Sequence, residues 1–134
     1  MRKVLLIGSI LGLIILAACN VGTSSTVQIT TVPVPAEYAG LANPLGADAA
    51  GEGAEIFKIN CAPCHGQQGH GDGPAGAALD PAPKDLSELH PVVGDDYLYW
   101  RINTGKPGTS MVAWQGIMTD EEIWQVVAFI RTFK

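Results

Sequence analysis

Residues 61–65 read Cys-Ala-Pro-Cys-His, and this short segment constrains the fold more than any other feature of the chain. Two thiols three positions apart, followed at once by an imidazole, are typical of covalent c-type haem attachment. At the end of a helix, Cys61 and Cys64 would reach the two vinyl groups on one edge of a porphyrin. His65 would then supply the proximal ligand of the iron. The motif therefore predicts a domain whose core is built around one haem.

Three other interpretations of the motif remain open beside the haem. A thioredoxin-like dithiol needs a βαβ setting, and no alternation of strand and helix patterns surrounds the motif. A zinc site needs a second pair of well-spaced ligands, and His70 and His90 do not form such a pair. A structural disulfide between Cys61 and Cys64 would leave His65 without a role. The haem interpretation is favoured because it uses all three side chains.

The N-terminal segment has the pattern of an exported lipoprotein. Two basic residues precede an apolar run at residues 4–18. As a helix this run rises about 22 Å, short of the roughly 30 Å of membrane hydrocarbon. Residues 16–19, Leu-Ala-Ala-Cys, resemble the lipobox of bacterial lipoproteins. The resemblance implies that residues 1–18 are a lipoprotein signal peptide and that Cys19 carries the lipid. An ordinary signal peptide or an uncleaved anchor would equally place the remainder outside the cytoplasm.

Residues 19–48 are predicted to connect the lipid to a folded domain at residues 49–134. The segment is rich in Thr, Ser, Val, Pro and Gly, and no partner is evident for its one strand-like stretch. Fully extended, residues 20–47 of this segment reach roughly 90 Å, enough to hold a small domain away from a membrane. A flexible tether and an ordered arm packed against a larger complex are both consistent with this composition.

The domain at residues 49–134 resembles the class I cytochromes c. Gly53, Phe57 and Cys61 stand at i, i+4 and i+8, on one face of a helix that ends at the motif. In that family this glycine and aromatic residue lie where the first helix crosses the last. The resemblance implies a small all-α fold of three to four helices wrapped around one covalently bound haem c.

Two further helices follow from the residues themselves. Thr119 and Glu122 form a capping box, and the apolar residues of 123–130 recur at helical spacing. Residues 95–102 begin with two acidic residues and contain three aromatic ones, and Gly105 would end this helix. The aromatic residues suit the wall of a haem pocket.

The resemblance places the second axial ligand in the loop before the last helix. Met111 occupies that position, and Val112 stands where the family usually has a proline. A methionine thioether opposite a histidine raises the reduction potential. Three other candidates are weaker. Met118 is predicted to lie under the last helix, His70 in an exposed loop, and His90 at the surface or beside the propionates.

Residues around the ligands are also implied by the resemblance. Pro74 matches the proline whose carbonyl accepts the N–H of the proximal histidine, here His65, and so fixes its tautomer. Residues 81–86 are expected to run along the propionate edge. The candidate propionate donors, which the sequence does not rank, are Lys84, Tyr97, Trp100 and Arg101.

The charge of the chain limits its partners. The 134 residues include 8 basic and 13 acidic side chains, a formal net charge of −5, and loss of residues 1–18 leaves −7. With no basic face to displace counterions from phosphates, nucleic acid is excluded as a partner. We expect redox partners with a basic surface, or a mostly apolar contact with weak salt dependence.

The resemblance implies an electron carrier and not an enzyme. Such a chain, lipid-anchored outside a bacterial membrane, would pass single electrons between respiratory or photosynthetic partners, such as a quinol-oxidising complex, a terminal oxidase or a reaction centre. It also resembles the monohaem lipoprotein subunit of alternative complex III, so a fixed subunit of such a complex is the alternative. If Met111 did not bind, an open iron would suit a peroxidase or a gas sensor.

Overall fold

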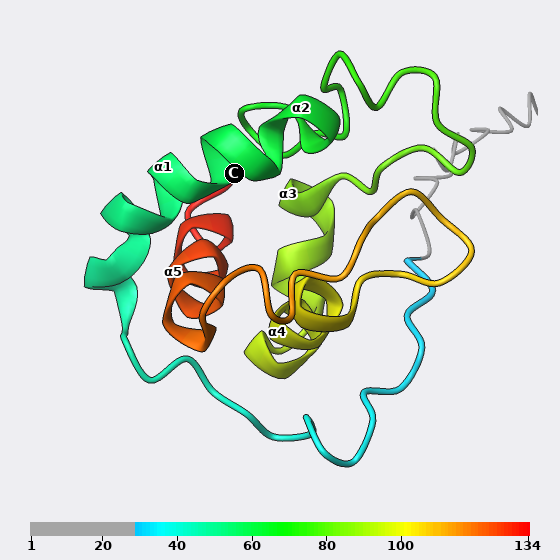
Figure 1. The fold of residues 1–134 in the computed structure, drawn as a ribbon. Helices are drawn as coiled ribbons and strands as arrows, with labels where there is room; N and C mark the ends of the chain where they lie inside the picture. Colours follow the sequence, from blue (N-terminus) through cyan, green and yellow to red (C-terminus); the bar gives the residue numbers. More distant parts are fainter. Residues whose placement is uncertain (1–28) are drawn as a thin grey trace, which may run out of the picture.

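Three helices of similar length carry the fold of this chain (Figure 1). We describe residues 29–134 from a computed structural model, so Cys19 and the predicted signal peptide lie outside the described residues. The elements in chain order are η1 (Ala47–Ala49), α1 (Ala50–Asn60), α2 (Ala62–His65), α3 (Leu86–Leu89), η2 (His90–Val92), α4 (Asp95–Thr104) and α5 (Asp120–Ile130). Within these residues the one β feature is an isolated bridge between Gln115 and Met118. The all-α prediction is confirmed, with α2 and α3 as single turns beside the three longer helices.

The first and last long helices cross at Gly53. A Cβ at this position would lie 1.9 Å from the carbonyl oxygen of Gln125, so only glycine allows α1 and α5 to approach so closely. One turn later Phe57, which is 1% exposed, packs against Phe129 and Phe133 with ring centroids 5.3 Å apart in both pairs. The crossing therefore fixes the end of α1, where the Cys-Ala-Pro-Cys-His motif begins.

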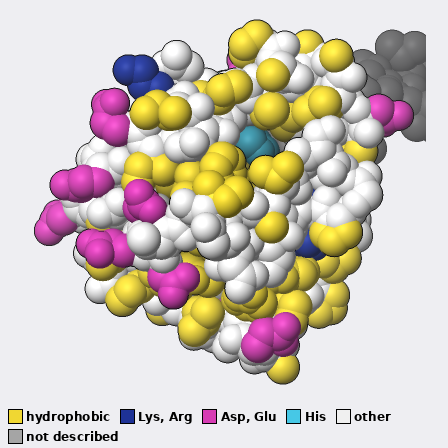
Figure 2. All heavy atoms as spheres, in the orientation of Figure 1, with side chains coloured by type: hydrophobic (Ala, Val, Ile, Leu, Met, Phe, Trp, Pro, Cys, Tyr) yellow, Lys and Arg dark blue, Asp and Glu magenta, His cyan; other side chains and the backbone are white. Residues whose placement is uncertain are grey.

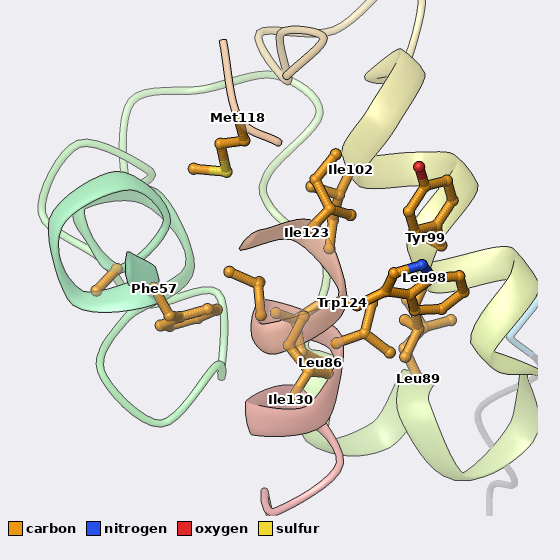
Figure 3. Close-up of a cluster of buried hydrophobic side chains, with 13 residues drawn as sticks. Phe57, Leu86, Leu89, Leu98, Tyr99, Ile102, Met118, Ile123, Trp124 and Ile130 are labelled. Atoms are coloured by element: carbon orange, nitrogen blue, oxygen red, sulfur yellow. The ribbon is translucent and has the colours of Figure 1, made fainter. Parts of the chain in front are cut away.

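The predicted capping box begins α5. Thr119 Oγ1 accepts the N–H of Glu122 at 3.2 Å, and Glu122 Oε2 accepts the N–H of Thr119 at 2.8 Å. Acidic residues in the first turn also favour the positive end of the helix dipole. The apolar face of α5 lies in a core between α1 and α4, and Figure 3 shows these side chains pointing toward one another. Ile123, Val126 and Val127 are fully buried there.

The third long helix, α4, packs against α5. Tyr99 stacks on Trp124 with ring centroids 4.2 Å apart, and its hydroxyl donates to Asp120 at 2.6 Å. After α5, Arg131 binds the Asp95 carboxylate at 2.7 Å and the carbonyl of Val93 at 2.9 Å. These contacts join the first half of α4 to both ends of α5.

The chain before α1 lies along α4 and α5 (cyan in Figure 1). The Tyr38 hydroxyl donates to Asn103 Oδ1 at 3.0 Å, and the Asn43 side chain donates to the carbonyl of Trp124 at 2.8 Å. The described part of the predicted tether thus contacts the helices, while the boundary at residue 49 stays a prediction. Across residues 29–134, no helix is both long and apolar enough to cross a membrane.

Candidate haem site

The Cys-Ala-Pro-Cys-His motif forms one helical turn directly after α1. The N–H of Cys61 donates to the carbonyl of Phe57 at 2.8 Å, and the N–H groups of Cys64 and His65 donate to the carbonyl of Cys61 at 3.1 and 2.9 Å. A proline suits the first turn of α2 because no helical bond needs its missing N–H. Both cysteines are free thiols, and both line the same cavity as His65.

Burial sets the protonation of these groups. It lowers the pKa of His65, against the opposing effect of a hydrogen bond to the carbonyl of Lys84, so the imidazole is neutral at pH 7. A neutral imidazole is the form that ligates iron. Burial, together with the neighbouring Cys64, raises the pKa of Cys61 to about 12. A thiol with this pKa is protonated at neutral pH, which disfavours a reactive dithiol.

The cavity beside the motif has a volume of about 300 Å³ and an unusual balance of charge. Its charged side chains are all basic, namely Lys84, Arg101 and Lys106, and none of the acidic residues of the described chain lines it. Figure 2 shows hydrophobic side chains around a hollow with a histidine visible in it, and acidic side chains toward the edges of the molecule. In a chain with an acidic excess, such a cavity suits a large apolar ligand that carries carboxylates.

Met111 reaches this cavity from the loop between α4 and α5. Its carbonyl accepts the N–H of Lys106 at 3.0 Å, and its N–H donates to Thr109 Oγ1 at 3.2 Å. The loop folds back over Gly105, whose φ is +69° and whose Cβ would lie 2.6 Å from the Met111 carbonyl oxygen. Trp114 anchors the far side through an N–H donated to the carbonyl of Ile102 at 3.1 Å. The structure thus brings Met111 to the same cavity as His65, and iron ligation by Met111 stays a prediction.

The other ligand candidates lie elsewhere. Met118 is 9% exposed within the hydrophobic core and does not line the cavity (Figure 3). His70 is exposed, with its Nδ1 3.2 Å from Ser87 Oγ. His90 Nε2 lies 3.1 Å from the carbonyl of Phe133. The geometry therefore favours Met111 over these three residues.

One buried donor in the cavity has no protein partner. Arg101 Nε is buried and makes no hydrogen bond to any described residue. A buried N–H group without a partner is rare and costly, so this atom indicates a missing acceptor. A propionate carboxylate is such an acceptor. The two thiols, the imidazole, the basic lining and this unpaired donor together fit a covalently bound haem.

Comparison with known proteins agrees with this geometry. Residues 48–130 match the family described as cytochrome C oxidase, cbb3-type, subunit III. Cytochrome c6 of Thermosynechococcus vestitus is 34% identical over 115 residues, which cover 86% of this chain and 87% of that protein. The chain is a class I cytochrome c. The family implies one covalently bound haem c and a function in electron transfer, and Cys61 and Cys64 have the spacing of the Cys-x-x-Cys-His motif.

Two solved structures share the fold of the cytochrome. A chain of the Kuenenia stuttgartiensis reducing HAO-like protein complex Kustc0457/Kustc0458 superposes with a TM-score of 0.59 and 26% identity over 75% of this chain. The cytochrome spans about half of that chain, 48% of its length. The KustC0563 c-type cytochrome superposes with a TM-score of 0.51 and 26% identity, over 61% of this chain and 96% of that one.

The carbonyl that accepts the ring N–H of His65 belongs to Lys84 and not, as predicted, to Pro74. His65 Nδ1 lies 3.3 Å from the carbonyl oxygen of Lys84, in the segment expected to run along the propionate edge. Pro74 is held elsewhere because its neighbours bind the motif backbone. The N–H of Gly73 donates to the carbonyl of Cys64 at 3.2 Å, and that of Ala75 to Pro63 at 2.8 Å. In the cytochrome the backbone of Lys84 therefore orients His65.

Proposed function

We propose that this cytochrome is a single-electron carrier in which His65 and Met111 fill both axial positions of the iron. The observation that supports the proposal most directly is that both side chains line one cavity together with Cys61 and Cys64. When bound, the haem supplies a one-electron couple between Fe(III) and Fe(II). With both axial positions filled by protein, no site remains for a substrate, so the proposal excludes peroxidase or gas-sensing activity.

The cavity walls favour the reduced state of such a centre. The apolar lining includes Leu86, Leu98, Ile102 and Val126, of which none is more than 7% exposed. A ferric haem carries one positive charge more than a ferrous haem, and an environment of low dielectric disfavours the extra charge. A thioether ligand at Met111 acts in the same direction. Both features raise the reduction potential.

We infer that partners meet the haem edge through an apolar contact. Val112, next to Met111, is 58% exposed, and Ile117 in the same loop is 69% exposed. No acidic side chain of the described residues lines the cavity, although the chain as a whole carries a net charge of −5. Such a surface favours a partner that is basic at its periphery and apolar at its centre.

This inference predicts the salt dependence of electron transfer. We expect faster oxidation of the reduced cytochrome by a basic redox protein than by an acidic one of equal potential. The rate with the basic protein should change less than tenfold between low and physiological ionic strength, where the screening length is about 8 Å. Stopped-flow mixing measures both rates. Faster reaction with the acidic protein would contradict the inferred docking surface.

We also propose that lipid on Cys19 anchors the cytochrome to the outer side of a bacterial membrane. The support is the sequence of residues 16–19, because Cys19 lies outside the described residues. Metabolic labelling with a fatty acid tests the proposal. The wild-type cytochrome should incorporate label and Cys19→Ala should not, while Cys61 and Cys64 remain bound to haem. Equal label in both proteins would contradict an anchor at Cys19.

A fixed subunit of a quinol-oxidising membrane complex is the second candidate function. One observation favours it, namely that a structural neighbour comes from a multi-protein complex. The described part of the predicted tether also packs against the helices through Tyr38 and Asn43, as expected of an ordered arm. Washing solubilised membranes with high salt in mild detergent separates the candidates. A carrier dissociates from its partners, whereas a subunit co-purifies with them.

A further inference from the structure

A short segment that precedes all the helices also lines the haem cavity. Residues 29–32, Ile-Thr-Thr-Val, form this segment, which we call the strap. All four of its residues line the same cavity as the Cys-Ala-Pro-Cys-His motif and Met111. The match to the family begins at residue 48, so the strap lies outside the domain that the family shares. The family therefore assigns no role to the strap.

Hydrogen bonds fix the chain that follows the strap to α4. The Tyr38 hydroxyl donates to Asn103 Oδ1 at 3.0 Å, and the N–H of Gly40 donates to Asp96 Oδ2 at 2.9 Å. Asn103 is 5% exposed, and a buried amide of this kind needs a hydrogen-bond partner. Because α4 itself lines the cavity, these bonds hold the chain to one of the cavity walls. Figure 1 shows this part of the chain running from its blue start to α1.

Two prolines stiffen the connection between the strap and these hydrogen bonds. Val32 precedes Pro33, and Val34 precedes Pro35. Proline fixes its own φ and keeps the preceding residue extended, so this stretch cannot coil into a helix. The carbonyl of Pro35 then accepts the N–H of Tyr38 at 2.9 Å, in the turn that leads to α4. The position of Tyr38 on α4 therefore restricts where the strap can lie.

The strap presents apolar and uncharged side chains to the cavity. Ile29 is half-buried and packs against the hydrophobic core, while Val32 is 50% exposed. The two threonines between them are exposed and neutral. Covering apolar surface of this kind is favourable, and a large apolar ligand in the cavity would cover it. The composition of the strap thus suits a wall that excludes water from the ligand.

We propose that the strap is a wall of the haem site, which lies against the bound haem, excludes water from it and so keeps the reduction potential high. The inference rests on the proposed function, in that it needs a bound haem. Less water at the haem means a lower dielectric, which disfavours the extra positive charge of the ferric state. The haem-binding unit then includes residues 29–32 in addition to the predicted domain at residues 49–134.

Opposite charges placed on the strap test whether it lies against the haem. Thr31 is exposed and lines the cavity, so it can accept either charge without burying it fully. In Thr31→Asp the carboxylate favours the ferric state, and in Thr31→Lys the ammonium favours the ferrous state. Because solvent screens part of this effect, we expect each variant to shift the oxidation equilibrium about threefold, or about 28 mV for one electron. Potentiometric titration of the full haem-loaded cytochrome measures the two shifts, which should have opposite signs.

Ala42 provides the matched control for these charges. It is exposed and belongs to the same stretch of chain before α1, but it does not line the cavity. Ala42→Asp and Ala42→Lys change the net charge as the Thr31 variants do, and both should keep the potential of the wild type. Equal potentials of Thr31→Asp and Thr31→Lys, in haem-loaded protein, would overturn the proposal.

Proton NMR of the wild type is a second measurement, which needs no substitution. The ring current of a reduced low-spin haem displaces the methyl signals of side chains that touch it, and oxidation shifts them again through the unpaired electron. We expect both effects for Ile29 and Val32 and neither for Ala42. Ordinary methyl signals of Ile29 and Val32 that do not respond to oxidation would overturn the proposal and leave the electron-carrier function intact. This measurement decides if the Thr31 variants do not bind haem. Absence of covalent haem in the wild type would instead refute the proposed function.

Discussion

Replacing Met111 by alanine is expected to change the iron site completely while leaving the fold in place. The weak ferric absorption band of sulfur ligation should disappear, because the loop from Gly105 to Trp114 would reach the cavity without a thioether. The reduction potential should fall on the order of 0.1 V, since the choice of axial ligand alone spans about 0.8 V across haem proteins. Absorption spectroscopy and potentiometry measure these changes.

The same variant tests whether the iron is closed in the wild type. Reduced wild-type cytochrome should bind carbon monoxide weakly at neutral pH, and Met111→Ala should bind it readily, because the axial position is then free. Tight binding by the wild type would contradict the carrier function and favour an open-site peroxidase or gas sensor. Tight binding of carbon monoxide by the wild type would mean that Met111 does not ligate the iron.

Met118→Ala is the matched control for the ligand assignment. Met118 lies in the hydrophobic core, 9% exposed, so its truncation should lower the free energy of unfolding by about 2–5 kcal/mol. Its sulfur-ligation band should stay as in the wild type. Loss of the band in Met118→Ala, with retention in Met111→Ala, would move the ligand to Met118 and contradict the site described above.

Replacing Gly53 by alanine is expected to destabilise the cytochrome, whereas the same replacement at Gly51 is not. The new Cβ would lie 1.9 Å from the carbonyl oxygen of Gln125 and 3.1 Å from the Cβ of Phe129, so α1 and α5 must move apart. Such overpacking costs about 1–3 kcal/mol, which the better helix propensity of alanine offsets by about 1 kcal/mol. Because α1 ends at the motif, the cavity should loosen as well.

Gly51→Ala, in the same helix, is the control for the crossing. No atom lies within 4 Å of a Cβ at Gly51, which is exposed. This variant should raise the free energy of unfolding by about 0.5–1 kcal/mol, since alanine is the better helix former. Denaturant unfolding followed by circular dichroism measures both variants. Equal effects of the two substitutions would show that the approach of α1 to α5 does not depend on Gly53.

Local patterns were sufficient to predict the parts of the fold that depend on neighbouring residues. The capping box of Thr119 and Glu122, and the apolar spacing after it, predict α5 because each contact is made within four residues. The start of α4 was predicted correctly at Asp95, and this helix ends two residues beyond the predicted 102. The role of Gly53 came from the family resemblance, and the structure agrees with it.

Contacts between distant segments could not be predicted in the same way. The Tyr38 hydroxyl bonds to Asn103, 65 residues away, and the Asn43 side chain bonds to Trp124, 81 residues away. No pattern in the sequence pairs such residues. The carbonyl that accepts the ring N–H of His65 is that of Lys84 and not that of Pro74. The sequence does not predict this difference, because local geometry does not fix the length of the loop between the motif and the acceptor.

The sequence also does not predict the sign of the charged residues that line the cavity. The net charge of −5 describes the whole chain and gives no sign that the cavity holds only basic charged residues. Among the four candidate propionate donors, Arg101 differs in having a buried Nε without a partner among the described residues. This unpaired Nε and the contact of the guanidinium with the Trp100 ring are properties of the folded chain.

We propose that Cys61, Cys64, His65 and Met111 together hold one covalent, low-spin haem. The visible spectrum of the mature cytochrome, oxidised and reduced, tests this directly after expression with the machinery that attaches c-type haem. We predict haem that acid and organic solvent do not extract, a low-spin spectrum in both states, and the weak ferric band of sulfur ligation. A protein without covalent haem, or a high-spin ferrous spectrum at neutral pH, would contradict the claim.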